Sequence, residues 1–358
     1  MTTLPFRSAA SVTAETLDDV LRQAGVLHAG RVSDVTSTPI GTGQMAQSVR
    51  LTIGYDGPSD GPTTVVGKFP STNADSRAVG RSLRAYEIEA GFYRELVATV
   101  GVRAPACHFV GFDPATHEFA LLLEDLAPAE AGDQLEGCGA DLAARVLSQA
   151  VSFHAPRWGD PSLKRVDWLN RSSPGAAATM ANLVRSLLPG FVERYGASLD
   201  PTTLDALALS VEHVERWWQG IGGPHTLFHG DLRLDNLLID PVQETVAVVD
   251  WQTLVLGNGV ADVSYFIGGN LLPDERRRVE GDLVRGYHHE LVAAGVDLSW
   301  DECWRRYRHG SWYGAFLAIV ASMLVERTER GDRMFVTDAD RHVRHALDLD
   351  AMSVIGEP

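Results

Sequence analysis

The chain has 358 residues, of which 45% are hydrophobic and 22% are charged, and its net charge is −16. This length suffices for two lobes that each bury a core, and the composition is that of a globular protein. The surplus of carboxylates disfavours a nucleic-acid partner, because binding to phosphates needs a basic face.

The cysteines and the apolar segments indicate the compartment. Cys107, Cys138 and Cys303 are too few and too scattered for a disulfide framework or a four-ligand zinc site. No basic segment followed by an apolar core opens the chain, so we expect no secretory signal. The most apolar stretch, 312–325, is shorter than the roughly 20 residues that a membrane helix needs. We therefore expect a cytoplasmic protein without a membrane span, with 312–325 as a buried helix.

The N-terminal part of the chain predicts a helix followed by strands. Residues 13–24 have helical spacing of apolar residues, with Thr13 placed to cap the helix and Gly25 placed to end it. From residue 31 the periodicity changes to that of strands separated by glycine-rich turns, at 32–39, 48–53 and 63–69.

Two features of these strands point to a nucleotide. Gly41 and Gly43 lie in the turn between the first two strands, where glycine lets backbone amides approach phosphate oxygens, although an ordinary hairpin is the alternative. Lys68 stands inside the apolar third strand, and its ammonium group needs an anionic partner there. The alternative is an edge strand from which Lys68 reaches solvent.

A helix predicted for 82–99 offers that partner. Ile88 and Phe92 belong to its apolar face, and Glu89 points with this face. A carboxylate on a buried face needs a cation, so we expect Glu89 to pair with Lys68, as a helix glutamate does in kinases to hold the lysine on the α- and β-phosphates. A glutamate that reaches water at the edge of the face is the alternative.

The middle of the chain predicts a connection and then helices. The apolar run 119–123 ends at Glu124, Asp125 and Leu126, and an Ala-, Gly- and Glu-rich segment follows. Helical spacing recurs at 141–154, 177–188 and 201–220, whereas 160–202 as a whole is the hardest part to interpret. Aromatic residues gather near the C-terminus; core packing is favoured over a cage for an ammonium group.

One polar loop collects the groups that phosphoryl transfer requires. Asp231, Arg233 and Asn236 lie between two short apolar runs, and Asp250 ends the second run. The reaction needs a carboxylate near the attacking hydroxyl, oxygen ligands for Mg²⁺ and a cation near the transferred phosphate. Asp231 can supply the first, Asn236 with Asp250 the second, and Arg233 the third. The spacing from Asp231 to Asn236 equals that of the kinase catalytic loop.

The motifs His229-Gly230-Asp231 and Asp250-Trp251-Gln252, with the segment 259–266, resemble the aminoglycoside phosphotransferase and choline kinase superfamily. Within it, they are most similar to the phosphotransferase enzyme family and ecdysteroid-kinase-like proteins. The resemblance implies an α+β, two-lobed protein-kinase-like fold, in which a small N-terminal lobe has an antiparallel sheet plus one helix and a larger C-terminal lobe is mainly helical. We expect a helical extension over 1–30 and a nucleotide-binding lobe over 31–126. The catalytic and substrate-binding lobe is expected over 127–358.

The resemblance also implies roles for single residues. Main-chain groups of 124–126 would bind adenine, and Asp262 would brace the catalytic loop from a following helix. His154 is interpreted as structural. Gln252 either supports the metal or the acceptor, or bonds to the loop.

The expected activity is transfer of the γ-phosphate of ATP, with Mg²⁺, to a hydroxyl group of a small molecule. The resemblance of Asp-Trp-Gln to the ecdysteroid-kinase-like branch implies a metabolic alcohol, a sterol-like or a hydroxyacyl compound rather than an aminoglycoside. An aminoglycoside 3'-phosphotransferase is one alternative, and a catalytically inactive nucleotide-binding regulator is another. A protein kinase is disfavoured, because no Ala-Pro-Glu element follows Asp250. Monomer and homodimer both stay open.

Overall fold

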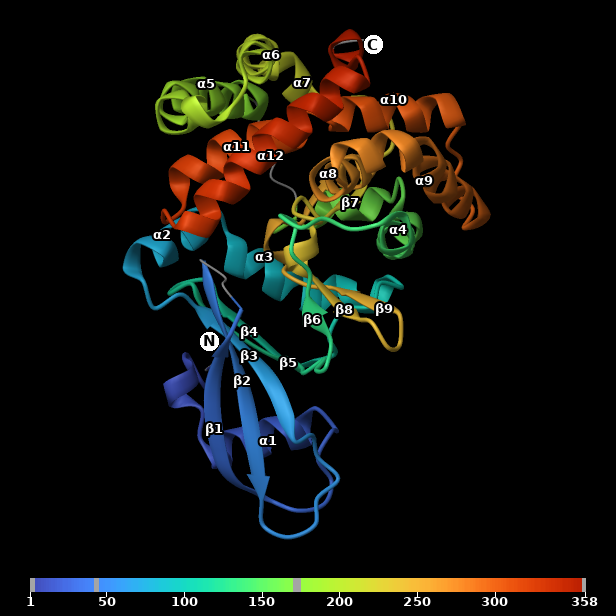
Figure 1. The fold of residues 1–358 in the computed structure, drawn as a ribbon. Coiled ribbons are helices and arrows are strands. Elements are labelled where there is room, and N and C mark those ends of the chain that lie inside the picture. Colours follow the sequence, from blue (N-terminus) through green and yellow to red (C-terminus); the bar gives the residue numbers. More distant parts are fainter. Residues whose placement is uncertain (1–3, 42–44, 170–174, 356–358) are drawn as a thin grey trace. The chain divides into compact units, whose positions relative to one another are not determined.

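The structure is a computed structural model that describes residues 4–41, 45–169 and 175–355, and the fold is drawn in Figure 1. The chain divides into two compact units. Unit 1 takes in 1–99, 104–129 and 249–253, and unit 2 takes in 100–103, 130–248 and 254–358. Each unit is built from segments that are far apart in the sequence.

Unit 1 contains an antiparallel sheet with the strand order β1-β2-β3-β5-β4. Its strands are β1 (Val32–Ile40), β2 (Ala46–Tyr55), β3 (Thr64–Pro70), β4 (Cys107–Asp113) and β5 (Glu118–Glu124). Lys68 on β3 is paired in register with Ser48 on one side and Leu121 on the other. Lys68 therefore lies on the central strand, and the edge-strand alternative is wrong.

Helix α1 (Ala14–Gln23) follows a short 3₁₀ turn, Ala9–Ser11. The Thr13 hydroxyl accepts a hydrogen bond from the backbone N–H of Thr16, as expected of a capping residue. Leu17 and Leu21 are fully buried in the same hydrophobic cluster as the inward side chains of the sheet. The helix is thus part of the core of unit 1 and not a separate extension, because its apolar face closes one side of the sheet.

The helix expected at 82–99 is a series of three shorter elements, α3 (Ala85–Gly91), a π-helical turn (Phe92–Leu96) and a 3₁₀ turn (Val97–Thr99). A further helix that the sequence did not predict, α2 (Ala74–Ser82), precedes them. The break between α2 and α3 comes at Arg84, whose backbone is left-handed at φ 57°. Of the three α-helices in the described part of unit 1, α1 and α3 fall in the helices expected at 13–24 and 82–99, and α2 was not expected.

Unit 2 is mainly helical. Its helices are α4 (Ala140–His154), α5 (Ala176–Tyr195), α6 (Pro201–Glu212), α7 (Val214–Gln219), α8 (Val260–Asn270), α9 (Pro273–Ala293), α10 (Trp300–Gly310), α11 (Tyr313–Leu324) and α12 (Glu329–Asp348). Short 3₁₀ turns lie at Ala155–Arg157, Pro161–Arg165, Gly196–Ser198, Leu234–Asn236 and Ala351–Val354. The helix expected at 201–220 is interrupted at His213, where α6 ends and α7 begins.

Two small sheets carry the polar loop of unit 2. One has the order β6-β8-β9, with β6 (Glu130–Ala131), β8 (Leu237–Asp240) and β9 (Thr245–Val248). The other pairs β7 (Thr226–Phe228) with β10 (Val255–Gly257). Residues 229–236 join β7 to β8, so the loop is held by a strand at each end.

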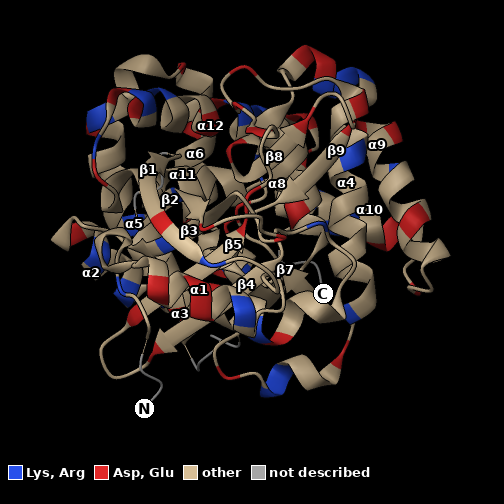
Figure 2. Cartoon of the chain, turned by 90° about the horizontal axis from the view of Figure 1, so that it is seen from below, with Lys and Arg blue, Asp and Glu red and all other residues tan. Residues whose placement is uncertain are grey.

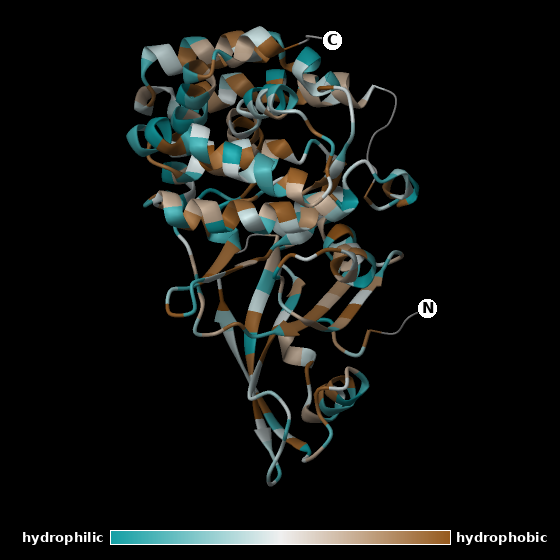
Figure 3. Ribbon diagram, turned by 90° about the vertical axis from the view of Figure 1, so that its right-hand side faces the viewer, coloured by the Kyte–Doolittle hydropathy of each residue, from teal (hydrophilic) through white to brown (hydrophobic). Residues whose placement is uncertain are grey.

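The helices of unit 2 carry apolar and polar bands, which Figure 3 shows as brown and teal. The apolar sides of α5, α6, α7, α11 and α12 form one hydrophobic cluster that includes Trp312 and Phe316. Tyr287, Tyr307 and Trp312 are buried, which agrees with core packing for these C-terminal aromatics. Among the described residues, no helix is both long enough and apolar enough to cross a membrane.

Candidate active site

Asp231 in unit 2 is held by three side chains. The Tyr265 hydroxyl donates to its Oδ1 at 3.1 Å, the Asn236 amide donates to its Oδ2 at 2.8 Å, and Arg233 Nε lies 3.1 Å from Oδ1. The Asn236 amide also donates to the main-chain oxygen of Asp231 at 2.9 Å. With 19% of its side chain exposed, this carboxylate is fixed in orientation but still accessible.

A second layer of polar groups fixes Arg233. One guanidinium nitrogen donates to Gln134 Oε1 at 3.0 Å, and the Gln134 amide donates in turn to Asp338. Burial lowers the pKa of Arg233, but the charge of Asp231, together with those of other nearby acidic groups, raises it above the ordinary value. Burial also raises the pKa of Asp338 to about 7. The chain Asp338–Gln134–Arg233–Asp231 therefore places one buried carboxylate behind the accessible one.

Asp262, on α8, braces the loop as expected. Its carboxylate accepts the backbone N–H groups of His229 and Gly230 at 2.7 and 2.9 Å. His154 Nε2 lies 3.2 Å from the same carboxylate, and His154 Nδ1 lies 2.9 Å from the Tyr287 hydroxyl. Burial lowers the pKa of His154 against the opposing charge of Asp262. His154 and Asp262 are both fully buried, and the contact by which Asp262 was expected to brace the loop is present.

Unit 1 contains the expected ion pair. Lys68 Nζ lies 2.7 Å from Glu89 Oε1, and 2.9 Å from Asp250 Oδ1. Glu89 is 2% exposed, so the alternative of a glutamate that reaches water is wrong. Burial lowers the pKa of Lys68, yet Asp250 and Glu89 together raise it above the ordinary value. Burial likewise raises the pKa of Glu89, and Lys68 opposes that shift.

The backbone of Asp250 is left-handed, with φ 65°, a conformation that is uncommon outside glycine. The neighbouring Trp251 is fully buried and stacks on Phe92, with ring centroids 3.8 Å apart. Packing of Trp251 on the helical segment that follows Glu89 explains why 249–253 belongs to unit 1 rather than to the expected range 127–358. The Gln252 amide donates to Asp250 Oδ2 at 3.1 Å.

The other predicted nucleotide residues also fall in unit 1. The Glu124 backbone N–H donates to the Ala106 oxygen at 2.8 Å, and its carboxylate accepts the Ala106 N–H at 3.0 Å. The Asp125 carboxylate pairs with Arg50 at 2.5 Å. Leu126 begins the turn after β5. Gly41 has a left-handed backbone at the end of β1, and Gly43 lies outside the described residues. Adenine and phosphate binding by these residues stays a prediction.

Sequence reasoning missed three residues of this site. Tyr265 lies in the segment 259–266, but its side chain was given no role. Gln134 lies in a connection without periodicity, and Asp338 lies on α12, more than 100 residues after Asp231. A charged residue on the buried face of α12 was the available signal for Asp338, because such a residue requires polar partners.

The match to known families agrees with this geometry. Residues 60–308, which are more than half of the chain, match the model of the phosphotransferase enzyme family. The chain therefore belongs to the phosphotransferase enzyme family, and the superfamily to which its motifs were assigned is confirmed.

Individual relatives refine this picture. A segment of 83 residues is 49% identical to acyl-CoA dehydrogenase family member 10 of Mus musculus, and the match spans 23% of this chain but only 7% of that protein. Choline kinase from Cryptosporidium parvum aligns over 96% of this chain and 98% of its own, with 12% identity and a TM-score of 0.59. The GDP complex of aminoglycoside 2'-phosphotransferase-IIIa aligns over 92% and 97%, with 14% identity and a TM-score of 0.51. The expected two-lobed kinase-like fold is thus confirmed.

Proposed function

We propose that this protein is a small-molecule kinase that transfers the γ-phosphate of ATP to a hydroxyl group. The observation that carries the proposal is the partly exposed Asp231 carboxylate, held at 2.8 to 3.1 Å by Asn236, Tyr265 and Arg233. Membership of the phosphotransferase enzyme family supports the same reaction class.

Asp231 is assigned the role of orienting the acceptor hydroxyl and taking its proton. In a loose phosphoryl-transfer transition state the proton can leave late, so the base need not be strong. The position of the Asp231 carboxylate therefore matters more than its basicity, and its hydrogen bonds hold it in position. Arg233 is assigned to offset charge on the transferred phosphoryl group, and its bond to Asp231 keeps the two groups together.

The donor oxygens suit Mg²⁺, which prefers carboxylate and amide oxygens. The Asn236 amide nitrogen donates to two oxygens of Asp231, which directs the amide oxygen elsewhere. The Asp250 side chain is 24% exposed, and Gln252 Oε1 is a buried oxygen with no hydrogen-bond partner in the part of the chain that the structure describes. We assign Asn236 and Asp250 as the metal-binding residues. Bound Mg²⁺ would neutralise charge on the nucleotide phosphates.

Lys68 is assigned to the α- and β-phosphates of the nucleotide. Glu89 and Asp250 hold its ammonium group from two sides, so the lysine is already oriented before a phosphate arrives. Gly41, Gly43 and the main chain of 124–126 are assigned to the nucleotide by the family pattern. Because a neighbour of this fold was solved with GDP, GTP belongs beside ATP in any test of the donor.

The acceptor is proposed to be a metabolic alcohol, a sterol-like or a hydroxyacyl compound. The name of the mouse relative refers to acyl-CoA, which makes hydroxyacyl thioesters the first acceptors to test. Choline and aminoglycosides are the next acceptors to test, because the structural neighbours are named for them.

The test is an ATP- and GTP-consumption screen of these acceptors, repeated with Asp231→Asn. We expect turnover with at least one acceptor in the presence of Mg²⁺, its loss in Asp231→Asn, and nearly unchanged binding of Mg·ATP. Asp200→Asn is the matched control, because Asp200 caps α6 and asparagine caps equally well. Full turnover by Asp231→Asn would refute the assignment. Nucleotide binding without turnover on any acceptor would instead favour the inactive regulator.

A further inference from the structure

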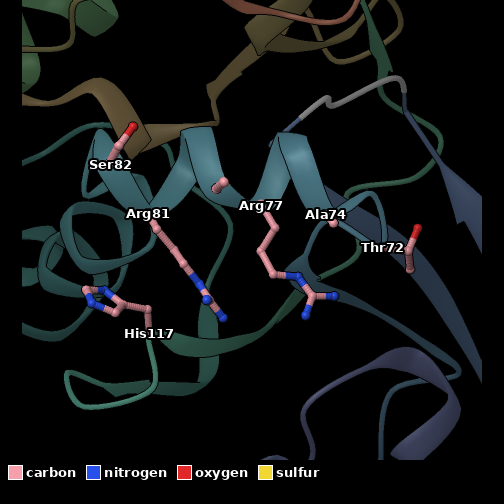
Figure 4. Close-up of a pocket in the computed structure, with 7 residues that line it drawn as sticks. Thr72, Ala74, Arg77, Arg81, Ser82 and His117 are labelled. Carbon is pink, nitrogen blue, oxygen red and sulfur yellow. The ribbon is translucent and has the colours of Figure 1, made fainter.

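Unit 1 has a surface cavity of about 650 Å³ that the proposed function does not use. It is lined by α2, by Thr72 just before that helix and by His117 in the turn between β4 and β5, and its lining on α2 includes Arg77 and Arg81. Figure 4 shows Arg77 and Arg81 extending from the same side of α2, with the His117 ring on the loop beside Arg81. The spacing of four residues places the two guanidinium groups one helical turn apart.

Arg77 and Arg81 differ from five other cations of unit 1 in their ion pairing. In unit 1 a carboxylate lies within 4 Å of Arg22, Arg50, Lys68, Arg84 and Arg94. Among the described residues, no ion pair joins Arg77 or Arg81 to a carboxylate. The chain as a whole has net charge −16, and blue ribbon, which marks Lys and Arg, lies beside the α2 label in Figure 2.

Part of this wall is fixed in place. Arg77 Nε donates to the Ser71 main-chain oxygen at 2.9 Å, which leaves the outer nitrogens of its guanidinium group for a ligand. Gly80 packs on the Tyr86 ring so closely that an added Cβ would lie 2.8 Å from the hydroxyl oxygen. The Tyr86 hydroxyl in turn donates to the Met45 oxygen at 2.6 Å. Helix α2 is therefore anchored at both the Ser71 and the Tyr86 contacts.

We propose that this cavity binds the phosphate group of an organic phosphate ester. Guanidinium groups match the oxygens of phosphate with paired N–H donors, and two of them suit a group with two negative charges. A ring N–H of His117 and the Thr72 hydroxyl can add two further hydrogen-bond donors. The cavity is much larger than an inorganic ion and lies within the range of small-molecule sites, so the ligand extends beyond its phosphate.

The experiment uses the full-length protein with pyrophosphate as the probe, titrated calorimetrically at constant ionic strength. The test variant is Arg81→Gln, which removes one guanidinium group and leaves the bond between Arg77 and Ser71 intact. The control is Arg94→Gln, because Arg94 is half-exposed, pairs with Glu95 and lies outside the cavity. We expect Arg81→Gln to weaken binding at least about tenfold, as loss of a charge-assisted hydrogen bond would, and Arg94→Gln to bind as the wild type does.

A local readout separates this cavity from any phosphate site at Lys68. Modification of arginines by phenylglyoxal, followed by mass spectrometry, should be slowed at Arg77 and Arg81 by pyrophosphate and unchanged at Arg94. Inorganic phosphate should protect more weakly, and citrate tests whether carboxylates suffice; protection by citrate equal to that by pyrophosphate would overturn the assignment to phosphate. No protection of Arg77 and Arg81, or equal affinities for wild type and Arg81→Gln, would overturn the site itself. Neither result bears on the kinase activity, which is measured separately.

Discussion

The hydroxyl of Tyr265 donates a hydrogen bond to Oδ1 of Asp231 at 3.1 Å, and the Tyr265 ring stacks on His342 with centroids 5.1 Å apart. His342 is buried, and burial holds its pKa well below the ordinary value, so the ring under Tyr265 is neutral. The orientation of the proposed catalytic carboxylate therefore depends on an aromatic pair from α8 and α12.

Replacing Tyr265 with phenylalanine removes the hydroxyl and keeps the stacked ring. A hydrogen bond to a charged group contributes about 1.5 to 3 kcal/mol, so we expect kcat to fall about tenfold or more while the KM for nucleotide changes little. Tyr195→Phe is the control, since it removes a bond from Tyr195 to Asp332 elsewhere in unit 2. Steady-state kinetics with an identified acceptor measures both. Equal kcat values in the two variants would show that Tyr265 does not position Asp231.

Lys68→Met and Glu89→Gln should differ in stability. Lys68→Met leaves Glu89 buried without its cation, at a cost of about 3 kcal/mol, whereas Glu89→Gln leaves Lys68 with Asp250. The loss in Lys68→Met should shrink as pH falls from 8 to 5, because burial raises the pKa of Glu89 and protonation would remove the stranded charge. Denaturant unfolding at several pH values measures this. A loss independent of pH would argue against a stranded Glu89.

Asp338 should make the free energy of unfolding depend on pH with the opposite sign to ordinary acid denaturation. Its folded pKa of about 7 exceeds its ordinary value of 3.8, so its contribution to the free energy of unfolding is complete below pH 3.8 and is lost as pH rises through 7. Relative to Asp338→Asn, the wild type should lose up to about 1.4 kcal/mol per pH unit across this window. Asp274→Asn, whose carboxylate is 97% exposed, should follow the wild type. If the free energy of unfolding of Asp338→Asn has the same pH dependence as that of the wild type, Asp338 does not titrate in this pH window.

Asp250 combines a left-handed backbone with a carboxylate assigned to Mg²⁺. Asparagine tolerates φ 65° and can still accept from Lys68. We therefore expect Asp250→Asn to keep its thermal stability but to lose at least about a hundredfold in kcat, in line with loss of a key electrostatic group. Asp250→Ala should lose about 1 kcal/mol of stability as well, from backbone strain. High activity in Asp250→Asn at saturating Mg²⁺ would remove Asp250 from the metal site.

Much of the fold and part of the site follow from local patterns. The alternation of apolar residues located the strands around Lys68, and helical spacing placed Glu89 on a buried face, so their ion pair could be predicted from the amino-acid sequence. The boundaries were less predictable, because the break at Arg84 depends on a single left-handed residue. That conformation leaves no signal in hydrophobic periodicity, and α2, which ends at Ser82 just before the break, was not predicted.

The sequence by itself determined which groups are candidates for the chemistry. The separation of Asp231 from Asn236, and the motif at Asp250, are local, and spacing along the chain sets them. Only the tertiary structure decided what surrounds these groups. Tyr265, Gln134 and Asp338 reach the loop from distant segments, because burying a charged group requires hydrogen-bond partners, and the packing of helices determines which side chains can be those partners.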